Sequence, residues 1–164
     1  MEENILLATT KTGCDIYITS TTREHMLAHA DVDLSFVAEA IATNDTYNGP
    51  FEIKSYDLGR IIGTTKCIEL TDAIRSKRFW AKRKGRKINS SLIMDEQPIA
   101  TSMIVVGICL DKDGFHKMFT SFYGELATKE IDDPRLTDEE RPEAEEFWNN
   151  HALIVTPEEI ETDE

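Results

Sequence analysis

The pattern of the sequence changes near Phe51, and this change restricts the possible folds more than any other feature. Before it, Leu34, Val37 and Ile41 recur at the spacing that places them on one apolar face of a helix. After it come short segments rich in β-branched and aromatic residues, most of them separated by turn signals. Helices followed by mostly antiparallel strands predict an α+β fold, with the N-terminal helices packed on the sheet. The predicted strands span residues 15–20, 51–56, 60–70, 77–83, 90–95, 102–110 and 115–124, with a hairpin turn at 111–114.

Two capping boxes predict where helices begin. In a capping box, a Ser or Thr is followed three residues later by Glu or Gln, and the two side chains satisfy free backbone groups. Thr21 with Glu24 predicts the start of a first helix, and Thr137 with Glu140 predicts the start of a C-terminal helix. One face of this C-terminal helix is expected to carry Ala144, Phe147, Trp148 and His151.

A chain of 164 residues, 40% hydrophobic and 30% charged, is typical of one globular domain. We expect this domain over residues 1–155, followed by an acidic disordered tail over residues 156–164. No segment approaches the roughly 18 apolar residues of a membrane span, and the N-terminal sequence lacks the basic start and cleavage site of a signal peptide. The three cysteines are far apart and form no CxxC pair, which predicts reduced thiols. The sequence therefore predicts a cytoplasmic protein with no membrane partner.

The net charge of −13 is unevenly distributed along the chain. Between Asp72 and Asp95 lie eight basic residues and no acid, whereas residues 125–164 carry 15 acids against three bases. A basic strip can bind phosphate groups, and an acidic segment would repel phosphate or occupy the strip itself. We expect the acidic end to lie near the strip, because the C-terminal helix must pack back onto the sheet that carries it. The strip consists of Arg75, Lys77, Arg78, Lys82, Arg83, Lys84, Arg86 and Lys87.

His25 and His29 lie four residues apart, and this spacing places them one above the other on a single helical face. Such a pair suits a metal site or an acid and base pair. A metal site needs a further ligand, however, and the residues between the two histidines supply none. A solvent-facing or structural role is the alternative for His25, whereas we favour a functional role for His29.

Aromatic residues are interleaved with cations in the basic strip, as is typical of proteins that stack bases along a charged track. Strand alternation would place Phe79 and Arg83 on one face. Arg78, Trp80 and Lys82 would then lie on the other face. Whichever face is inner carries at least one cation, which needs a partner or a function. The alternative is a solvated connection between two strands, with one of the aromatics in the core.

Three further residues have both a structural and a functional interpretation. Thr120 is one of the hydroxyl residues of "MFTSFYG". These hydroxyls can contribute to a functional site only if their strand is central in the sheet and faces the helix that carries His25 and His29. His151 follows an aromatic pair and precedes an apolar run, so a buried structural histidine is as well supported as a catalytic one. His116, just after the hairpin turn, is expected to be exposed.

Metal-free cleavage of RNA requires few side chains: a base for the 2′-hydroxyl proton, an acid for the leaving 5′-oxygen, and cations or donors around the phosphate. Histidine, arginine or lysine, and a hydroxyl residue are sufficient, and the chain supplies all three outside its acidic end. The sequence contains no Gly-rich phosphate loop, no GxSxG motif and no carboxylate cluster typical of a metal nuclease. We therefore expect neither a metal ion nor a cofactor.

Several segments resemble a family of small uncharacterised proteins carried by phages and mobile elements. The resemblance rests on the helical HxxxH followed by "DVDLSFVAEAI", the basic "FWAKRKGRKINSSLIMD", the strand pair "MIVVGICLDKDGFHKMFTSFYGELA" and the terminal "FWNNHALIV". It runs from about Ile16 to Val155. That family in turn resembles the barnase, EndoU, colicin D and RelE (BECR) group of metal-independent ribonucleases. The resemblance implies a BECR-like fold and an endoribonuclease that cleaves RNA by transesterification, as a toxin or effector of a phage or mobile element.

The resemblance also implies a set of site residues. His29 corresponds to the helical histidine, Arg83 to the inward cation of the "AKR" strand, and Thr120 to the strand hydroxyl before the final loop. His151 completes the catalytic group, and we expect His29 and Arg83 to converge in one cleft. The residues expected to contact RNA are Lys82, Lys84, Arg86, Trp80 and His25.

The chain departs from the expected family pattern after the strand pair, where Lys129 and Ile131 stand in place of prolines and an aromatic residue. The expected partners are RNA, with tRNA as a candidate, and a cognate antitoxin or a host protein. The alternative function is an inhibitor or decoy without catalytic activity, whose acidic surface mimics nucleic acid in the groove of a host enzyme. Positive charge around His29 would favour the ribonuclease, and negative charge would favour the decoy.

Overall fold

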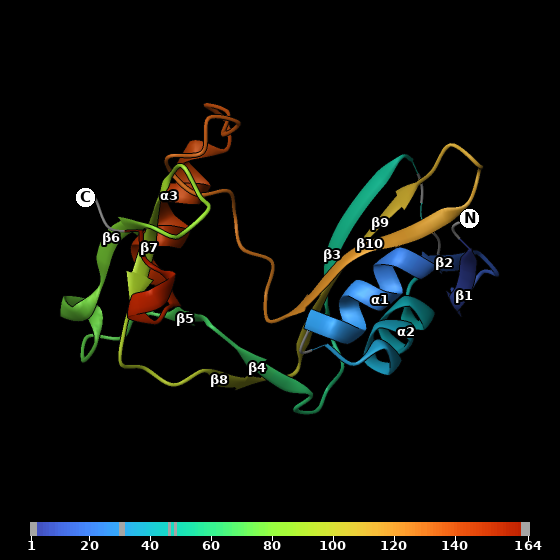
Figure 1. Ribbon diagram of the computed structural model, residues 1–164, viewed down its shortest axis with the longest axis horizontal. Helices are drawn as coiled ribbons and strands as arrows, with labels where there is room; N and C mark the ends of the chain where they lie inside the picture. Colours follow the sequence, from blue (N-terminus) through green and yellow to red (C-terminus); the bar gives the residue numbers. More distant parts are fainter. Residues whose placement is uncertain (1–2, 30–31, 46, 48, 162–164) are drawn as a thin grey trace. The chain divides into compact units, whose positions relative to one another are not determined.

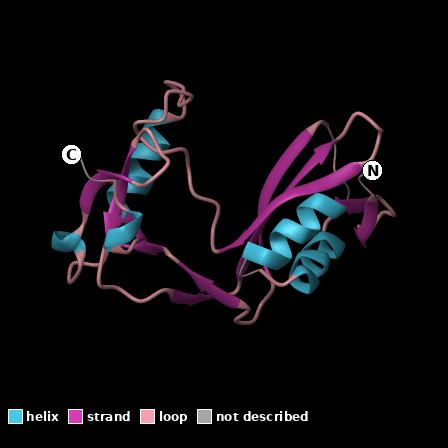
Figure 2. Ribbon diagram, in the orientation of Figure 1, coloured by secondary structure: helices cyan, strands magenta, loops and turns pink. Residues whose placement is uncertain are grey.

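The computed structural model describes residues 3–29, 32–45, 47 and 49–161, except for the side chains of residues 28 and 29 (Figures 1 and 2). The chain divides into two compact units. Unit 1 comprises Met1–Thr64 and Ala100–Leu126, and unit 2 comprises Thr65–Ile99 and Ala127–Glu164. Both units combine helices with mostly antiparallel strands, which confirms the predicted α+β class. A single domain over residues 1–155 stays a prediction.

Unit 1 contains a five-stranded sheet in the order β1-β2-β10-β9-β3, with helices α1 and α2 on one face (Figure 1). Strands β2 and β10 pair in parallel, and the other neighbours pair antiparallel. A separate two-stranded sheet pairs β4 (Gly63–Thr65) with β8 (Ile99–Thr101). The elements of the main layer are β1 (Asn4–Thr9), β2 (Asp15–Thr19), α1 (Ser20–His29), α2 (Leu34–Thr43), β3 (Phe51–Asp57), β9 (Met103–Leu110) and β10 (His116–Tyr123).

Helix α1 begins at Ser20, before the position that the capping box predicts. Its cap is Thr19, whose Oγ1 accepts a hydrogen bond from the backbone N–H of Thr22 at 3.2 Å. The prediction that Thr21 and Glu24 cap this helix is therefore wrong. Thr19 at the end of β2 already supplies the oxygen that the first turn needs, so the helix starts directly after the strand.

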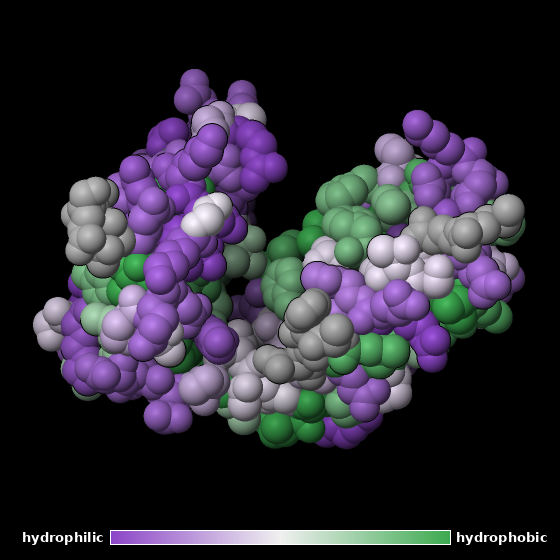
Figure 3. Space-filling view, viewed as in Figure 1, coloured by the Kyte–Doolittle hydropathy of each residue, from purple (hydrophilic) through white to green (hydrophobic). Residues whose placement is uncertain are grey.

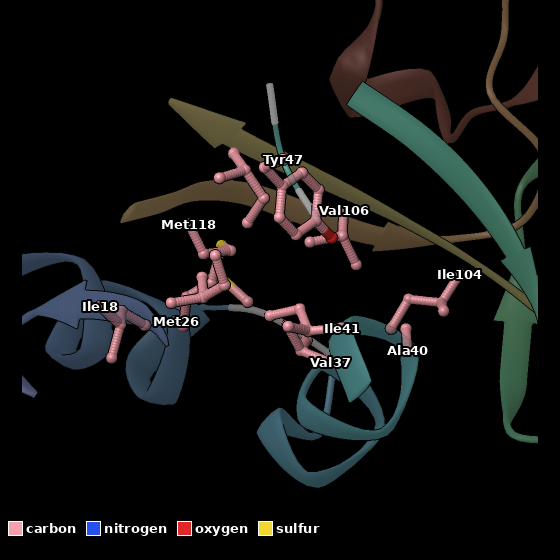
Figure 4. Packing of buried hydrophobic residues seen from close by; sticks show 11 residues of the cluster. Ile18, Met26, Val37, Ala40, Ile41, Tyr47, Ile104, Val106 and Met118 are labelled. Carbon is pink, nitrogen blue, oxygen red and sulfur yellow. The ribbon is translucent and has the colours of Figure 1, made fainter. Parts of the chain in front are cut away.

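The core of unit 1 lies between its two helices and its sheet (Figure 4). Ile41 of α2 is fully buried, which confirms the predicted apolar face of that helix. Ile104 and Val106 of β9 pack against the helices from the sheet side. Because side chains alternate along a strand, Gly107 belongs to the opposite face. The buried cluster consists of Ile16, Ile18, Met26, Val37, Ala40, Ile41, Tyr47, Ile104, Val106, Ile108 and Met118.

The predicted hairpin turn joins β9 to β10. The N–H of Gly114 donates to the carbonyl oxygen of Asp111 at 3.0 Å, and the φ of Gly114 is +85°, a conformation that glycine adopts readily. The ammonium group of Lys117 lies 2.8 Å from the carboxylates of both Asp111 and Asp113. This ammonium group lowers the pKa of both carboxyls, that of Asp113 to about 2.

Unit 2 contains a four-stranded sheet in the order β5-β11-β7-β6. Strands β11 and β7 pair in parallel, and the other neighbours pair antiparallel. Its apolar cluster is smaller than that of unit 1 and consists of Ile68, Leu70, Ile93, Ala152 and Ile154. Within the described residues, no helix is long and apolar enough to cross a membrane. The elements are β5 (Cys67–Glu69), η1 (Arg75–Lys77), β6 (Phe79–Lys82), β7 (Asn89–Ile93), α3 (Arg141–Asn150), β11 (His151–Ile154) and η2 (Pro157–Glu159).

The capping-box hydrogen bonds predicted for Thr137 and Glu140 are present, but α3 itself begins later, at Arg141, without a side-chain cap. Oγ1 of Thr137 accepts a hydrogen bond from the N–H of Glu140 at 3.2 Å, and Oε1 of Glu140 accepts one from the N–H of Thr137 at 3.0 Å. Helix α3 ends at Asn150, however, so the prediction that His151 continues its helical face is wrong. His151 is the first residue of β11, because its backbone pairs with Glu69 of β5.

Candidate nucleic-acid interface

Strand β6 carries aromatic and basic side chains whose exposure alternates. Trp80 and Lys82 are exposed, whereas Phe79 and Ala81 are partly buried, and so is Arg83, which follows the strand. The predicted alternation is therefore seen from Phe79 to Arg83, with Arg83 as an inward cation, whereas Arg78, expected on the face of Trp80 and Lys82, is partly buried. An inward guanidinium group needs a compensating partner, and that partner defines the first part of the site.

The partner of Arg83 is Glu130, which is 8% exposed. Oε1 of Glu130 accepts a hydrogen bond from Nη2 of Arg83 at 3.0 Å and lies 3.7 Å from Nη2 of Arg86. Oε2 of the same carboxylate accepts a hydrogen bond from Oγ of Ser90 at 2.6 Å. Two guanidinium groups thus converge on one carboxylate, so these three side chains carry a net charge of +1, and the charge of Arg83 also acts on Glu159 of the C-terminal segment.

The Nε–H group of Arg83 is buried and has no hydrogen-bond partner among the described residues. A buried donor without a partner costs roughly 1–3 kcal/mol, so a water molecule or a ligand is expected to satisfy it. An anion bound by Arg83 and Arg86 would satisfy the donor and balance the excess charge through charge-assisted hydrogen bonds. An anion is therefore the kind of ligand whose charge would complement this cluster.

Arg78 joins β6 to α3. Its Nη1 donates to the carbonyl oxygen of Trp148 at 2.9 Å and to Oγ of Ser91 at 3.1 Å. Its guanidinium carbon lies 4.9 Å from the centroid of the Trp80 ring, a cation–π contact. Burial, helped by the nearby charge of Arg75, lowers the pKa of Arg78, although a guanidinium group stays charged. We interpret Arg78 as the residue that holds the Trp80 ring in place.

The connection between β6 and β7 carries the exposed cations of the site. Lys84, Arg86 and Lys87 are exposed there, close in sequence to the exposed Lys82 of β6. Gly85 has a φ of +80°, which allows the chain to turn between these cations. Four of the residues expected to contact RNA, Lys82, Lys84, Arg86 and Trp80, therefore belong to one β-hairpin.

A pocket of about 270 Å³ lies beside the Trp80 ring. Its other lining residues are Asn89 of β7 and two residues of the loop before α3, Ile131 and Asp132. The pocket thus combines a flat aromatic side chain and an apolar side chain with an amide and a carboxylate. This combination is typical of sites that bind flat polar ligands.

A disordered tail is predicted for residues 156–164, of which residues 162–164 lie outside the described part of the structure. Up to Glu161 the chain forms a short helical turn and one β-bridge, between Ile160 and Arg83 just after β6. The N–H of Lys84 donates to the carbonyl oxygen of Glu159 at 2.8 Å. The N–H of Glu161 donates to the carbonyl oxygen of Lys82 at 2.9 Å. These bonds satisfy backbone groups that an edge strand would otherwise leave open, which explains why an acid-rich segment is held here. The described part of the acidic end therefore lies beside the basic strip, as predicted from the packing of the C-terminal helix back onto the sheet.

His151 is partly buried and is held by the end of α3. Its Nδ1 lies 2.9 Å from the carbonyl oxygen of Phe147, and its ring stacks on the Phe147 ring with centroids 4.1 Å apart. Because a carbonyl oxygen can only accept, Nδ1 carries the proton in this bond and Nε2 is left for proton transfer. Among the described residues, no hydrogen bond or ring contact joins His151 to Arg83.

The other expected site residues belong to unit 1. His29 is the last residue of α1, and its side chain is outside the described part of the structure. His25 is exposed. Thr120 lies on β10, the middle strand of the sheet, opposite Gly107 of β9. Cγ2 of Thr120 stands 2.8 Å from where a Cβ on Gly107 would be, so Thr120 is on the face away from the helices.

The expected catalytic residues are thus divided between the units. His29 and Thr120 lie in unit 1, whereas Arg83 and His151 lie in unit 2. Each unit is described by itself, so the convergence of His29 and Arg83 in one cleft stays a prediction. What the structure does bring together within unit 2 is Arg83 with Arg86 and Glu130.

Sequence reasoning missed Glu130, Asn89 and Asp132. The signal for Glu130 was indirect, since an inward Arg83 requires a partner but does not indicate which acid supplies it. Glu130 also stands between Lys129 and Ile131, in the loop that departs from the expected family pattern. That departure therefore falls on the segment that supplies the carboxylates of the site.

The chain matches none of the protein families, curated proteins or solved structures with which it was compared. The resemblance to the phage and mobile-element family, and through it to the BECR ribonucleases, therefore stays a prediction. The chemistry of unit 2 has to be inferred from the geometry around β6.

Proposed function

We propose that the protein binds RNA through the edge strand β6 of unit 2 and cleaves it by metal-independent transesterification. The observation that carries the proposal is the buried Nε–H of Arg83, which lacks a partner among the described residues and lies in the same cluster as Arg86. Exposed Lys82 and Lys84 supply charge for neighbouring phosphates, and exposed Trp80 supplies a ring on which a base can stack.

In this reaction the 2′-oxygen of RNA attacks the adjacent phosphorus, the bond to the 5′-oxygen breaks, and the product ends in a 2′,3′-cyclic phosphate. Glu130 is the residue that we assign to accept the 2′-hydroxyl proton, because it borders the guanidinium groups that would hold the phosphate. Arg83 and Arg86 would stabilise the charge that develops on the phosphate oxygens. The proton for the leaving 5′-oxygen would come from His151 or His29, the two histidines that the resemblance implies.

One assay with a triple lysine variant tests the proposal. The full chain is incubated with labelled single-stranded RNA and with total tRNA in EDTA, and binding and cyclic-phosphate products are measured. Replacing Lys82, Lys84 and Lys87 by Ala should weaken binding by roughly tenfold or more at low salt, and by less as salt rises, because fewer counterions are released. The matched control replaces three exposed lysines of unit 1 by Ala, namely Lys11, Lys54 and Lys112.

Equal weakening by the two triple variants would contradict the assignment of the interface to β6. Tight binding without cyclic-phosphate products would leave RNA binding in place and contradict the cleavage step. Cleavage that is lost on addition of EDTA would contradict the metal-independent mechanism, because the residues assigned here act without a metal ion.

A second candidate function is the acidic decoy, which the surface of α3 favours. The helix and the loop before it are mostly hydrophilic in the view of Figure 3, and their exposed acids are Asp132, Asp138, Glu139, Glu143, Glu145 and Glu146. A row of carboxylates can imitate the charge of a phosphate backbone. The two candidates predict opposite results in the assay above, since a decoy would not bind RNA with or without the three lysines of β6 and its turn.

A further inference from the structure

Strand β3 (Phe51–Asp57) is the outermost strand at one edge of the five-stranded sheet of unit 1 (Figure 1). Four of its seven residues are exposed. An edge strand presents backbone N–H and C=O groups that can pair with a strand from another chain. We propose that β3 pairs antiparallel with β3 of a second copy of this chain, so that the two sheets join into one. The inference concerns unit 1 and does not rest on the proposed function.

The backbone groups that β3 leaves open follow from its pairing with β9. The N–H of Leu110 donates to the carbonyl oxygen of Pro50 at 2.9 Å, just before β3 begins. In an antiparallel ladder, every second residue exchanges hydrogen bonds with the neighbouring strand, so the even-numbered residues of β3 bond to β9. The backbone groups of Phe51, Ile53 and Ser55 therefore point away from β9. Among the described residues, these groups have no hydrogen-bond partner.

Two other edge strands are protected in ways that β3 is not. On the opposite edge of the same sheet, the register of β1 shifts between Leu6 and Ala8, and such an irregularity disrupts pairing with a further strand. In unit 2, the C-terminal segment bonds to the edge of β6. Strand β3 keeps a regular register against β9 from Phe51 to Asp57, and no strand of the described residues pairs with its outer edge. It is therefore a regular and open edge.

The charged residues of β3 select the register of the pairing. Residues that stand opposite each other in an antiparallel pair lie on the same face of the sheet, and opposite charges there stabilise the pair, whereas like charges destabilise it. A pairing centred on Glu52 or on Lys54 would set two like charges against each other. A pairing centred on Ile53 sets Glu52 of each copy opposite Lys54 of the other. It also brings the open backbone groups of Ile53 in the two copies together, so charge and hydrogen bonding favour the same register.

Neither charge of β3 is saturated within its own chain. Oε1 of Glu52 lies 2.8 Å from Nζ of Lys54, but the Lys54 side chain is still 45% exposed. The buried Oε2 of Glu52 has no hydrogen-bond partner among the described residues. In the joined sheet, each carboxylate would lie between the lysine of its own chain and that of the second copy. These residue pairs exchange no backbone hydrogen bonds across the edge, which is the class of pair whose side chains approach more closely.

The other face of β3 supplies apolar contacts to the same register. Ile53 pairs with Gly107 of β9, on the face away from the helices. On this face Phe51 is 59% exposed, and its ring lies 5.1 Å from the ring of Phe119. Centring the pairing on Ile53 sets the two Ile53 side chains against each other and Phe51 opposite Ser55 of the second copy. Phe51 would thus move from the edge to the interior of the joined sheet, with Ile53 of the second copy as a diagonal neighbour.

The test measures the mass of the full chain by analytical ultracentrifugation, without RNA, at increasing concentration. The mass should rise from that of one chain to that of two. Lys54→Glu and Glu52→Lys should each weaken self-association by about tenfold, because each sets like charges opposite at both symmetric positions. An equimolar mixture of these two variants should regain the affinity of the unmodified chain, since the charges are complementary again. Circular dichroism checks that each variant is folded. The matched controls, Lys112→Glu and Glu24→Lys, change exposed residues of unit 1 outside β3 and should leave self-association unchanged.

A second measurement locates the contact on the chain. Hydrogen exchange of the backbone amides of Phe51, Ile53 and Ser55 should slow as the chain associates, whereas the amides of Glu52 and Lys54, which already bond to β9, should change little. A mass of one chain at every concentration up to about 1 mM overturns the proposal. Self-association that neither single variant weakens, or that the mixture fails to restore, also overturns it. Loss in both single variants, recovery in the mixture and slower exchange at the three outward amides support it.

Discussion

The two units of the molecule differ in the size of their apolar clusters. In unit 1, a continuous apolar cluster fills the space between two helices and a sheet. In unit 2, the apolar cluster is smaller. Both units also bury polar side chains, namely Thr10, Lys117 and Ser121 in unit 1 and Ser90, Ser91, Glu130 and Asp133 in unit 2. Because apolar burial is the main stabilising contribution to folding, the difference predicts that unit 1 is the more stable of the two.

The largest expected effect separates the stability of the two units. Both tryptophans, Trp80 and Trp148, lie in unit 2, so tryptophan fluorescence follows the unfolding of that unit alone, whereas circular dichroism follows both. Ile104→Ala in the core of unit 1 should lower the free energy of unfolding by about 2–5 kcal/mol, because it removes buried methyl groups and leaves a cavity. In urea, the circular dichroism transition should shift and the fluorescence transition should stay in place.

The matched control for that experiment is Leu92→Ala, because Leu92 is fully buried in β7 of unit 2. This variant should shift the fluorescence transition toward lower urea. If Ile104→Ala moved both transitions by the same amount, the two units would unfold as one cooperative structure, and the comparison between them would not describe separate stabilities.

A smaller effect is expected from the buried carboxylate. Glu130→Ala leaves Arg83 and Arg86 without their anion and Ser90 without its acceptor. Because the Arg83 side chain is 27% exposed and partly solvated, we expect a loss of about 1–3 kcal/mol, below the range for a fully buried pair. The fluorescence transition in urea measures this loss.

Two further variants define the role of Glu130. Glu130→Gln keeps the acceptor for Ser90 and should cost less stability than the alanine variant, yet it should still abolish cleavage, because an amide cannot take the 2′-hydroxyl proton. Glu96→Ala removes the partner of Lys77 in a more exposed pair at 3.3 Å and should change stability by less than about 1 kcal/mol. A Glu130→Gln variant that cleaves RNA normally would contradict the catalytic assignment.

The predictions that held depend on neighbours in the sequence. The apolar spacing of α2, the turn at residues 111–114 and the capping box of Thr137 and Glu140 each involve residues a few positions apart. Local geometry decides such features, so a sequence can predict them. The end of α3 was misplaced because His151 keeps the spacing of the helical face, while pairing with β5, a distant strand, draws its backbone into a sheet.

The candidate site could be predicted only in part, because it is assembled by contacts between distant residues. Strand alternation leaves open which face of β6 is inner, and only the resemblance implies that Arg83 is the inward cation. Its partner Glu130 is 47 residues away and is one of many acids in an acid-rich segment. The same holds for the C-terminal segment, whose composition predicts disorder. Its pairing depends on open backbone groups of β6, which no property of the segment itself indicates.

The smallest expected effect concerns the charge of that C-terminal segment. Its backbone pairs with Lys82 and Lys84, and its free acids stand close to the basic strip. The carboxylate of Glu159 accepts hydrogen bonds from Thr156, which lower its pKa, and the charges of Lys66 and Arg83 lower it further. The other acids of the described part of this segment, Glu158 and Glu161, are exposed.

A chain that ends at Val155 would remove these acids, but it would also remove the backbone bonds that cover β6. The double variant Glu158→Gln and Glu161→Gln removes the charge alone and keeps the pairing. It should tighten RNA binding by about two- to threefold at low salt. The gain should disappear at high salt, because the Debye length falls from about 10 Å at 0.1 M to about 3 Å at 1 M. Exposed Glu145→Gln with Glu146→Gln on α3 is the matched control. Equal affinities of the double variant and the unmodified chain at low salt would show that the segment covers the edge of β6 without competing for its cations.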